Sequence, residues 1–249
     1  MTSTEFEVND DAEAAMTPPT DPAIAQLLTV SGPQAAGLGV RGRFHSHVTV
    51  HLGDPDEAGD TDAALARLRD LCQSRKVKLT VIDLARGDRR QRDVMTTCYH
   101  RHDGDDAVAR IVEEMAALGR ALSGAGFPVL RFKLEHESLP TLRRFTPERY
   151  REIHVKLSLP EADADTRLAR LAELAPALGV VPSRNPLERR AGRVIQFVNL
   201  RIYDGDLAAC ERRVDGVVAA LEADGFTVLQ VKRETTVLDT RRAHDAWWA

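Results

Sequence analysis

Residues 126–135 read GFPVLRFKLE, and residues 225–234 read GFTVLQVKRE. Both segments begin with Gly-Phe, continue with apolar residues at alternate positions, and end in Lys-x-Glu. Alternation with a period of two is typical of a β-strand that buries one face. Two such similar strands in one chain predict an internal repeat.

Further identities extend the repeat towards the start of each half. The tetrapeptide LARL occurs at 65–68 and again at 168–171, each time in a segment with apolar residues at helical spacing. The tripeptide DGD occurs at 103–105 and 204–206, where it supplies a turn and an N-capping acid before a second helix. Each half therefore follows the order strand, helix, two strands, helix, strand, which is the ferredoxin-like pattern.

We predict an α+β fold made by tandem duplication of a ferredoxin-like βαββαβ unit. Each unit would form an antiparallel four-stranded sheet with helices on one face and strand order 4-1-3-2. The predicted divisions are a disordered acidic leader (1–40), lobe 1 (41–136), a linker (137–150), lobe 2 (151–239) and a C-terminal tail (240–249). Within the leader, Ile24, Leu27 and Leu28 could form a short docking turn.

The distribution of charge excludes several classes of protein. Residues 1–40 carry six acids and no Lys or Arg, so the rest of the chain has 34 Lys and Arg against 32 acids. This balance argues against a strongly polybasic nucleic-acid binder, because binding to a phosphate backbone requires a large positive surplus. No apolar run is long enough for a membrane span, and the N-terminus lacks the pattern of a signal peptide, so we expect a soluble, cytoplasmic protein. Three widely spaced cysteines do not predict disulfides or a cysteine zinc site.

Alternation also predicts which side chains face away from the helices. In the first strand, Val48, Val50 and Leu52 should face the helices. In the third strand of lobe 1, Tyr99 is expected on the helix side. The other face would carry polar residues: His45, His47, Thr49, His51, Cys98, His100, His102, Arg131, Lys133 and Glu135 in lobe 1, and Glu152, His154, Lys156, Ser158, Asn199, Arg201, Tyr203, Gln230, Lys232 and Glu234 in lobe 2. Because buried charge is costly unless it is paired, we expect these faces to line a solvated cleft or tunnel that holds a ligand.

Two short motifs resemble those of known enzymes. His47-Val48-Thr49 and His154-Val155-Lys156 occupy equivalent positions in the two lobes, and the pair resembles the H-x-[ST] motifs of the two-histidine phosphoesterases. That resemblance implies that His47 and His154 act as base and acid on a phosphate, and that hydroxyls hold its oxygens. Lys156 stands where the family has a hydroxyl.

The strand 152–156, EIHVK, is similar to the E-x-E-x-K strand of the triphosphate-tunnel enzymes, with His154 in place of the middle Glu. This resemblance implies a closed barrel lined by Lys, Arg and Glu that holds a polyphosphate and a divalent metal. Lys133 and Lys232, each followed two positions later by Glu, would suit such a lining.

A metal site is a third hypothesis. His45 and His47 form one H-x-H pair, and His100 and His102 form another on a neighbouring strand, so four imidazoles could meet at one point. The Arg-rich turns near 86–92 and 184–193 are either solvated charge or a gate for anions.

The sequence thus favours an enzyme, of phosphoesterase or hydrolase type, that acts on a phosphorylated small molecule or nucleotide between the lobes. His47 and His154 are the catalytic candidates, and the substrate-binding candidates are Thr49, Lys133, Lys156, Arg201, Tyr203 and Lys232. The cofactor is undetermined, a divalent metal being one option. The alternatives are a non-catalytic ligand-sensing or assembly module and a His-rich metal-dependent enzyme.

Overall fold

The computed structural model describes residues 21–35, 42–52, 61–86, 89–102, 104–137, 149–188 and 191–241. Its strands are β1 (Gly42–Val50), β2 (Lys78–Arg86), β3 (Arg89–His102), β4 (Val129–His136), β5 (Arg151–Pro160), β6 (Val181–Arg184), β7 (Arg193–Ile202) and β8 (Thr227–Asp239). Its helices are α1 (Pro22–Ala35), α2 (Thr61–Ser74), α3 (Ala107–Gly124), the 3-10 turn η1 (Glu161–Asp163), α4 (Ala164–Leu178) and α5 (Leu207–Ala223).

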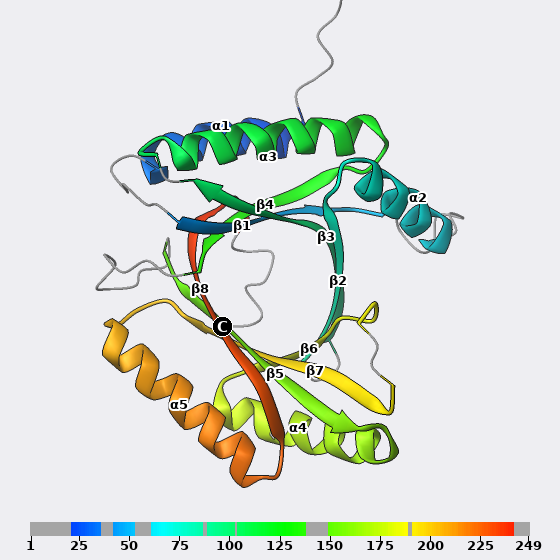
Figure 1. Cartoon of the computed structure of the whole chain (residues 1–249), viewed down its shortest axis with the longest axis vertical. Helices are drawn as coiled ribbons and strands as arrows, with labels where there is room; N and C mark the ends of the chain where they lie inside the picture. The colour runs from blue at the N-terminus through cyan, green and yellow to red at the C-terminus, as the bar shows by residue number, and fades with distance from the viewer. Residues whose placement is uncertain are drawn as a thin grey trace, which may run out of the picture.

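The strands form one closed antiparallel barrel in the order β1-β3-β2-β6-β7-β5-β8-β4 (Figure 1). Within this ring the first half of the chain has the order β4-β1-β3-β2, and the second half has β8-β5-β7-β6. This is the predicted 4-1-3-2 order in each half. The prediction of a mixed helix and strand fold with antiparallel sheet is therefore confirmed.

The prediction of two separate four-stranded sheets is wrong. Each half has two edge strands, and each of them pairs with an edge strand of the other half. At one seam β2 pairs with β6 over a short stretch, Asp83–Leu84 against Ser183–Arg184. At the other seam β4 pairs with β8, with Lys133 opposite Asp239 and His136 opposite Thr235. Closure satisfies the backbone groups that an open sheet edge leaves unpaired, which is the physical reason that it is favoured.

The helices cover the outside of the barrel, and the apolar cores lie between helices and strands. Figure 1 shows α1 and α3 on one side and α4 and α5 on the opposite side. Most of the strand residues predicted to face the helices are buried in these two cores: Val48, Val50, Phe132 and Leu134 in the first, and Ile153, Val155, Leu157, Leu159, Val198, Leu200 and Ile202 in the second. Leu52 is partly buried against the first core. The barrel interior is consequently left to the alternate, polar side chains.

Helix α1 corrects part of the predicted leader. Residues 22–35 form a helix instead of a disordered segment, and α1 packs on α3 with Ile24 and Leu27 buried. The Asp21 carboxylate accepts a hydrogen bond from Ser123 Oγ at 2.5 Å, and Gln26 Nε2 donates to the Thr240 carbonyl at 2.6 Å. These contacts tie the segment to the barrel; the rest of the predicted leader lies outside the described residues.

Most of the predicted linker and tail also lies outside the described residues. Tyr150, at the end of the predicted linker, is buried in the barrel. No helix in the described part of the chain is both long enough and apolar enough to cross a membrane.

Candidate functional site

A cavity of about 220 Å³ lies inside the barrel and is lined from both halves of the chain. Its charged and histidine lining residues are His47, Lys78, Asp93, Arg131, Lys133, Glu135, Glu152, His154, Lys156, Glu188, Arg201, Lys232 and Glu234. Of the predicted site residues, this lining includes both catalytic candidates and every substrate-binding candidate except Tyr203. The two predicted open faces therefore enclose one shared space.

The two halves place equivalent residues at equivalent points of this lining. On β1, His47 stands opposite Thr97 of β3 and Lys133 of β4. On β5, His154 stands opposite Asn199 of β7 and Lys232 of β8. Residues that are directly opposite on antiparallel strands point to the same face. Each histidine is thus flanked by one hydrogen-bonding residue and one lysine.

Glu152 is at the centre of a buried ion-pair network. Its carboxylate accepts from Lys133 Nζ at 2.5 Å and from Arg201 Nε at 3.1 Å. Lys133 Nζ also lies 2.6 Å from Glu135 Oε1. Burial alone would raise the pKa of Glu152, but the charges of Arg201 and Lys133 outweigh it and hold the pKa well below its usual range. Glu152 is therefore a carboxylate that fixes these cations inside the barrel.

Glu234, on β8 of the same half of the chain, has a similar role. It contacts His45 Nδ1, Lys232 Nζ at 2.9 Å and His154 Nε2 at 3.4 Å. Burial opposes ionisation of Glu234, but the hydrogen bonds from His154 and His45 and the nearby positive charges lower its pKa. This carboxylate joins β1, β5 and β8 across the interior.

The hydrogen bonds of His154 require protons on both ring nitrogens. Nδ1 lies 2.7 Å from Asn199 Oδ1, and Asn199 Nδ2 donates to the Val181 carbonyl and to Ser183 Oγ, which fixes the amide orientation. Nε2 faces the carboxylates of Glu234 and Glu152. Burial lowers the pKa of His154, but the hydrogen bond to Glu234 and the surrounding carboxylates outweigh burial and raise it. These contacts therefore favour the protonated imidazolium form of His154.

His47 has a different environment. Its Nε2 lies 3.1 Å from Glu135 Oε2, and its Nδ1 lies 3.1 Å from Thr97 Oγ1. Burial raises the pKa of Glu135, but the charge of Lys133 and the hydrogen bond from His47 lower it further than burial raises it. Because an ionised carboxylate can only accept, His47 carries a proton on Nε2. In the neutral ring, Nδ1 then presents a lone pair to a hydroxyl.

A second buried cluster stabilises the seam between β4 and β8. Arg131 donates from Nε and an NH₂ group to the two Asp239 oxygens at 2.8 and 2.5 Å, and Tyr150 Oη donates to Asp239 at 2.9 Å. Burial raises the pKa of the Tyr150 phenol, so it stays a hydrogen-bond donor. Its ring lies 5.8 Å from Lys133 Nζ and 5.4 Å from Arg201 Cζ. The cluster holds the barrel closed beside the cavity.

The predicted four-histidine metal set is wrong. Register places His47 opposite Thr97 and His45 opposite Tyr99, so Thr97 and Tyr99 point into the barrel. Cys98, His100 and His102 therefore face outward, and Tyr99 was assigned to the wrong side of β3. His45 contacts Glu234 in the interior, whereas His100 and His102 contact Glu114 of α3. The sheet itself separates the two pairs.

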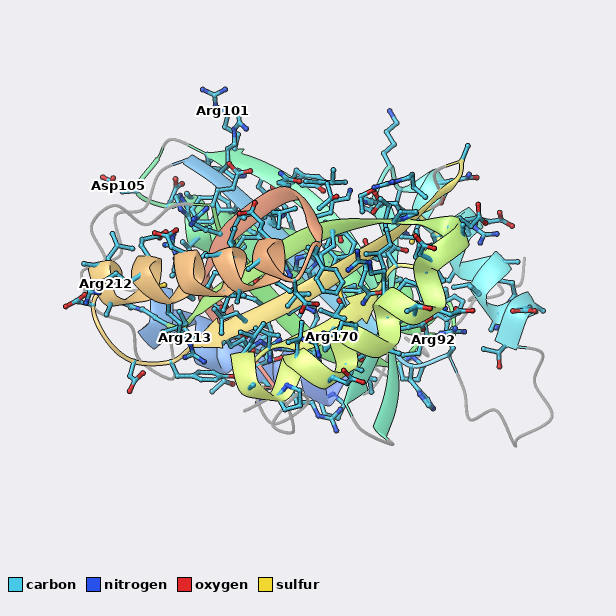
Figure 2. All side chains as sticks on the ribbon, turned by 90° about the horizontal axis from the view of Figure 1, so that it is seen from below. Arg92, Arg101, Asp105, Arg170, Arg212 and Arg213 are labelled. Atoms are coloured by element: carbon cyan, nitrogen blue, oxygen red, sulfur yellow. The ribbon has the colours of Figure 1, made fainter. Side chains whose placement is uncertain are left out.

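Of the remaining predicted binding residues, Tyr203 lies outside the cavity, and Thr49 and Lys156 lie in its lining. Tyr203 follows the end of β7, where its ring lies 5.1 Å from that of Tyr150 and outside the cavity lining. Thr49 and Lys156 both line the cavity, and Lys156 Nζ lies 2.5 Å from Glu188. Arg101 extends from the far end of β3 into solvent (Figure 2).

Three arginines beside the two Arg-rich turns have partners in the structure. Arg92 donates to Asp83 at 2.7 and 3.3 Å, and Arg184 lies 3.8 Å from the same carboxylate. Arg193 donates to Ser158 Oγ at 2.8 Å. Arg92 and Arg184 therefore share Asp83 at the β2–β6 seam, and these contacts support a structural role there.

Glu135, Glu152 and Glu234 lie on the predicted polar face, where the sequence indicates them as part of a lining and not as the partners of particular cations. Their position two residues from a lysine or histidine is the signal for those ion pairs. Thr97 was assigned to no face, and Glu114 lies on the polar side of a helix. Neither has a motif of its own, so only the register of β1 against β3 and the packing of α3 reveal them.

Comparisons with known proteins add little to this description. No protein-family model matches the chain, and no curated protein sequence matches it. Among solved structures, one described as a "putative monooxygenase" from Fusobacterium nucleatum has 4% identity and a TM-score of 0.25. The alignment covers 79% of this chain and 92% of the Fusobacterium chain. The small subunit of acetolactate synthase from Thermotoga maritima has 13% identity, a TM-score of 0.23, and covers 77% and 92%. Both TM-scores are below 0.5, so the site must be interpreted from its own geometry.

Proposed function

We propose that the barrel interior binds the phosphate chain of a phosphorylated small molecule, and that His47 and His154 catalyse hydrolysis of its phosphate bond. The observation that carries the proposal is the order of the charges around the cavity. Cationic side chains reach the cavity, and carboxylates lie behind them. This arrangement favours an anionic ligand over a cationic one.

The exposed fractions of the side chains make the contrast quantitative. They are 37% for Lys232, 23% for His154, 16% for Lys156 and 16% for His47, against 2–3% for Glu135, Glu152 and Glu234. Three side chains depart from this contrast: Lys133 at 10% and Arg201 at 6% are almost as buried as the glutamates, and Glu188, the partner of Lys156, is 28% exposed. The buried glutamates hold the cations in place, and an entering anion can add to these cations without displacing the glutamates. Positioned charges of this kind bind more strongly in a low-dielectric interior than in water.

The size of the cavity narrows the class of ligand. Sites for drug-sized molecules usually have about 300–1,000 Å³, and this one has about 220 Å³. A phosphate chain suits this volume better than a whole nucleotide, whose base would remain outside the barrel. The closed barrel with alternating Lys and Glu is also the feature implied by the resemblance to the triphosphate-tunnel enzymes.

The barrel carboxylates do not fit the divalent metal that the same resemblance implies. Lys133, Arg201 and His45 already occupy them. Among the described residues, the three-ligand group whose atoms converge is His100, His102 and Glu114, outside the barrel. We therefore assign no step to a metal in the cavity.

The two histidines supply complementary acid and base groups. His47, oriented by Glu135, accepts a proton at Nδ1 from a water molecule that takes the place of the Thr97 hydroxyl. The water oxygen forms a bond to phosphorus as the bond to the leaving oxygen breaks. His154 donates its Nε2 proton to that leaving oxygen; this nitrogen is at 3.4 Å from Glu234, whereas Nδ1 is held by Asn199 at 2.7 Å. Lys133, Lys156, Arg201 and Lys232 offset the charge of the phosphate oxygens.

Binding is tested by calorimetric titration of the full chain with inorganic phosphate, pyrophosphate and tripolyphosphate. We expect one tripolyphosphate per chain, and a loss of about 10- to 100-fold in affinity in Lys232→Gln, the value of one charge-assisted hydrogen bond. Arg212→Gln is the matched control, because Arg212 lies on the outer surface of α5 (Figure 2) and its loss removes the same charge. Equal affinities in the two variants would exclude the cavity as the binding site.

Hydrolysis is tested separately by release of inorganic phosphate from tripolyphosphate and nucleoside triphosphates. His47→Ala and His154→Ala should each reduce turnover by about 10²–10⁴-fold, with the circular dichroism spectrum unchanged. Activity that survives in the double variant would refute the catalytic assignment. Binding without any turnover in the wild type would refute the hydrolase and support the alternative, a ligand-sensing module.

We further propose that the two halves of the barrel arose as a tandem duplication of a ferredoxin-like unit. The repeated strand GF-x-VL-x-x-K-x-E supports this origin, and so does the equivalent register that places His47 opposite Lys133 and His154 opposite Lys232. Expression of residues 41–136 alone tests it: a folded unit that self-associates is expected, and an unfolded chain would contradict an independently folding ancestor.

A further inference from the structure

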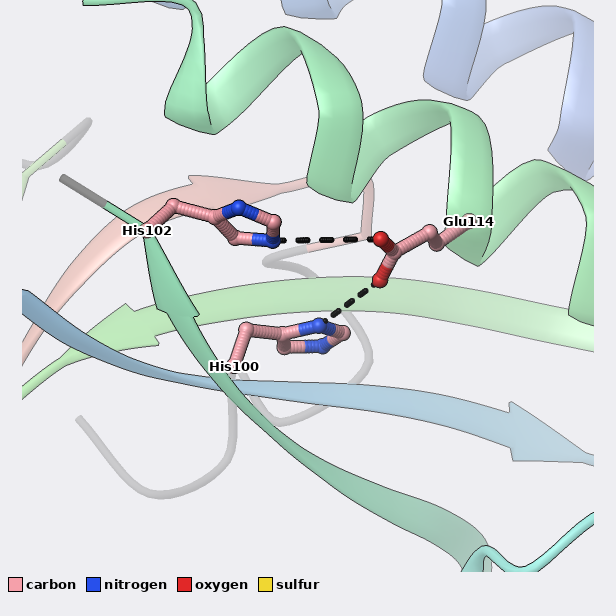
Figure 3. Close-up of side chains that lie close together, drawn as sticks. All are labelled: His100, His102 and Glu114. Atoms are coloured by element: carbon pink, nitrogen blue, oxygen red, sulfur yellow. Dashed lines mark ion pairs between the residues drawn. The ribbon is translucent and has the colours of Figure 1, made fainter. Parts of the chain in front are cut away.

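Three metal-ligating side chains converge on the outer surface of the barrel, away from the cavity. His100 and His102 project from the end of β3, and Glu114 projects from α3 between them (Figure 3). His100 Nδ1 lies 2.9 Å from Glu114 Oε2, and His102 Nε2 lies 3.8 Å from Glu114 Oε1. The three candidate ligand atoms all lie within 4.8 Å of one another.

These separations suit a small divalent ion. Zinc binds imidazole nitrogen and carboxylate oxygen at about 2.0–2.2 Å with tetrahedral angles, which places neighbouring ligand atoms about 3.3–3.6 Å apart. The two histidine nitrogens lie 2.9 and 3.8 Å from the two Glu114 oxygens, on either side of this range, and the exposed Glu114 side chain has room to adjust these distances by rotation. Two imidazoles and one carboxylate favour zinc, cobalt, nickel or copper over magnesium or calcium, which prefer oxygen ligands.

The second nitrogen of His100 is also positioned as in a metal site. Ser46 Oγ of β1 lies 2.7 Å from His100 Nε2, and the Ser46 side chain is buried. A ligating histidine usually donates its other N–H to a fixed acceptor, which sets the ring orientation and the tautomer. Ser46 therefore directs Nδ1 of His100 towards Glu114.

We propose that His100, His102 and Glu114 bind one divalent transition-metal ion of the zinc class, with Ser46 as the residue that positions His100. The Glu114 side chain is half exposed, so the ion keeps a coordination position open to water. The site joins the end of β3 to α3. Thr97 and Tyr99, on the same strand as the two histidines, line the cavity on the inner face of the barrel. The metal would therefore stabilise the strand that carries part of the anion site.

Cobalt(II) is the probe, because a tetrahedral Co²⁺ site has intense visible absorption bands. The metal-free full chain is titrated with CoCl₂ and then with ZnCl₂, and Glu113→Gln is the control, since Glu113 is the exposed neighbour of Glu114 on α3. Wild type and control should each bind one more equivalent of Co²⁺ than His102→Ala/Glu114→Gln, and Zn²⁺ should displace it. Loss of the Ser46 hydroxyl in Ser46→Ala should weaken binding by about 10- to 100-fold.

The double substitution removes two exposed or half-exposed groups, and its circular dichroism spectrum should match that of the control. Equal Co²⁺ stoichiometry and affinity in the double variant and the control would overturn the proposal. Unchanged affinity in Ser46→Ala would overturn the role given to Ser46.

Discussion

The substitution Glu152→Gln tests the buried charge network that organises the barrel interior. Glu152 is 3% exposed and accepts from Lys133 at 2.5 Å and from Arg201 at 3.1 and 3.3 Å. Removal of one partner from a buried ion pair costs about 3–5 kcal/mol. Lys133 keeps Glu135 at 2.6 Å, and glutamine keeps a carbonyl acceptor, so we expect the lower end, about 3 kcal/mol. In a domain of this size that lowers Tm by about 6–12 °C.

The assay is urea unfolding followed by circular dichroism at pH 7, with Asp106→Asn as the control. Asp106 pairs with Arg110 on the exposed first turn of α3, and its substitution should leave the unfolding midpoint unchanged. A loss below about 1 kcal/mol in Glu152→Gln, the range of an exposed pair, would refute the network as a source of stability.

The dependence on pH gives an independent check of the same prediction. Because the pKa of Glu152 is lower in the folded than in the unfolded state, its stabilisation is complete above the unfolded pKa of about 4.3 and is lost as the pH falls. The difference in unfolding free energy between wild type and Glu152→Gln should therefore shrink between pH 5 and pH 3. An equal difference at pH 7 and pH 3 would contradict the assignment of Glu152 as a buried carboxylate.

Three further predictions concern other parts of the fold. The pKa of His154, measured by NMR, should lie above the ordinary value of about 6.5 and fall in Glu234→Gln; its stabilisation is present at lower pH and disappears as the pH rises through the raised pKa, so a wild-type value at or below 6.5 would contradict it. Gly119→Ala should destabilise the protein by about 1–3 kcal/mol in chemical unfolding, because the new Cβ would stand 2.6 Å from Phe132 Cζ in the core, and a neutral result would show that the core can yield. Burial raises the pKa of Cys72 to about 11, so this thiol should react with a disulfide reagent at pH 8 far more slowly in the native than in the unfolded protein, and equal rates would refute its burial.

The faces of four strands were predictable because most of their positions alternate between apolar and polar residues. In β4, β5, β7 and β8 most residues on the helix side are apolar, and most of their neighbours are charged or polar. Arg233, which contacts Glu211 of α5, and Phe197, which lines the cavity, depart from this pattern. In β3 the segment 95–102 reads MTTCYHRH, which gives no apolar face. There the aromatic side chain of Tyr99 predicts the wrong face. Tyr99 lies on the cavity side of β3, and it is 63% exposed to solvent.

Closure of the barrel was not predictable from periodicity, because it depends on pairing between edges. The β2–β6 seam uses two residue pairs, and β8 reaches β4 only by continuing beyond the repeated segment to Asp239. Nothing in the alternation of a strand specifies its partner across such a seam. The cavity was predictable, because charged sheet faces should enclose a solvated space whatever the strand pairing is. That expectation depends on the residue types and not on the topology.

The convergence of His100, His102 and Glu114 also required the fold. The H-x-H spacing identifies the histidines, but the third ligand comes from a helix whose position depends on packing against β1. The sequence therefore indicated metal-binding residue types and paired them with the wrong partners.

The central claim is that an anion binds inside the barrel, and a crystal structure with tripolyphosphate tests it most directly. The account predicts phosphate density in the cavity, within hydrogen-bond distance of Lys232 and His154, with Glu152 and Glu234 still paired behind them. Density confined to the Arg-rich turns outside the barrel, or an unchanged cavity at a concentration that saturates binding in solution, would contradict it.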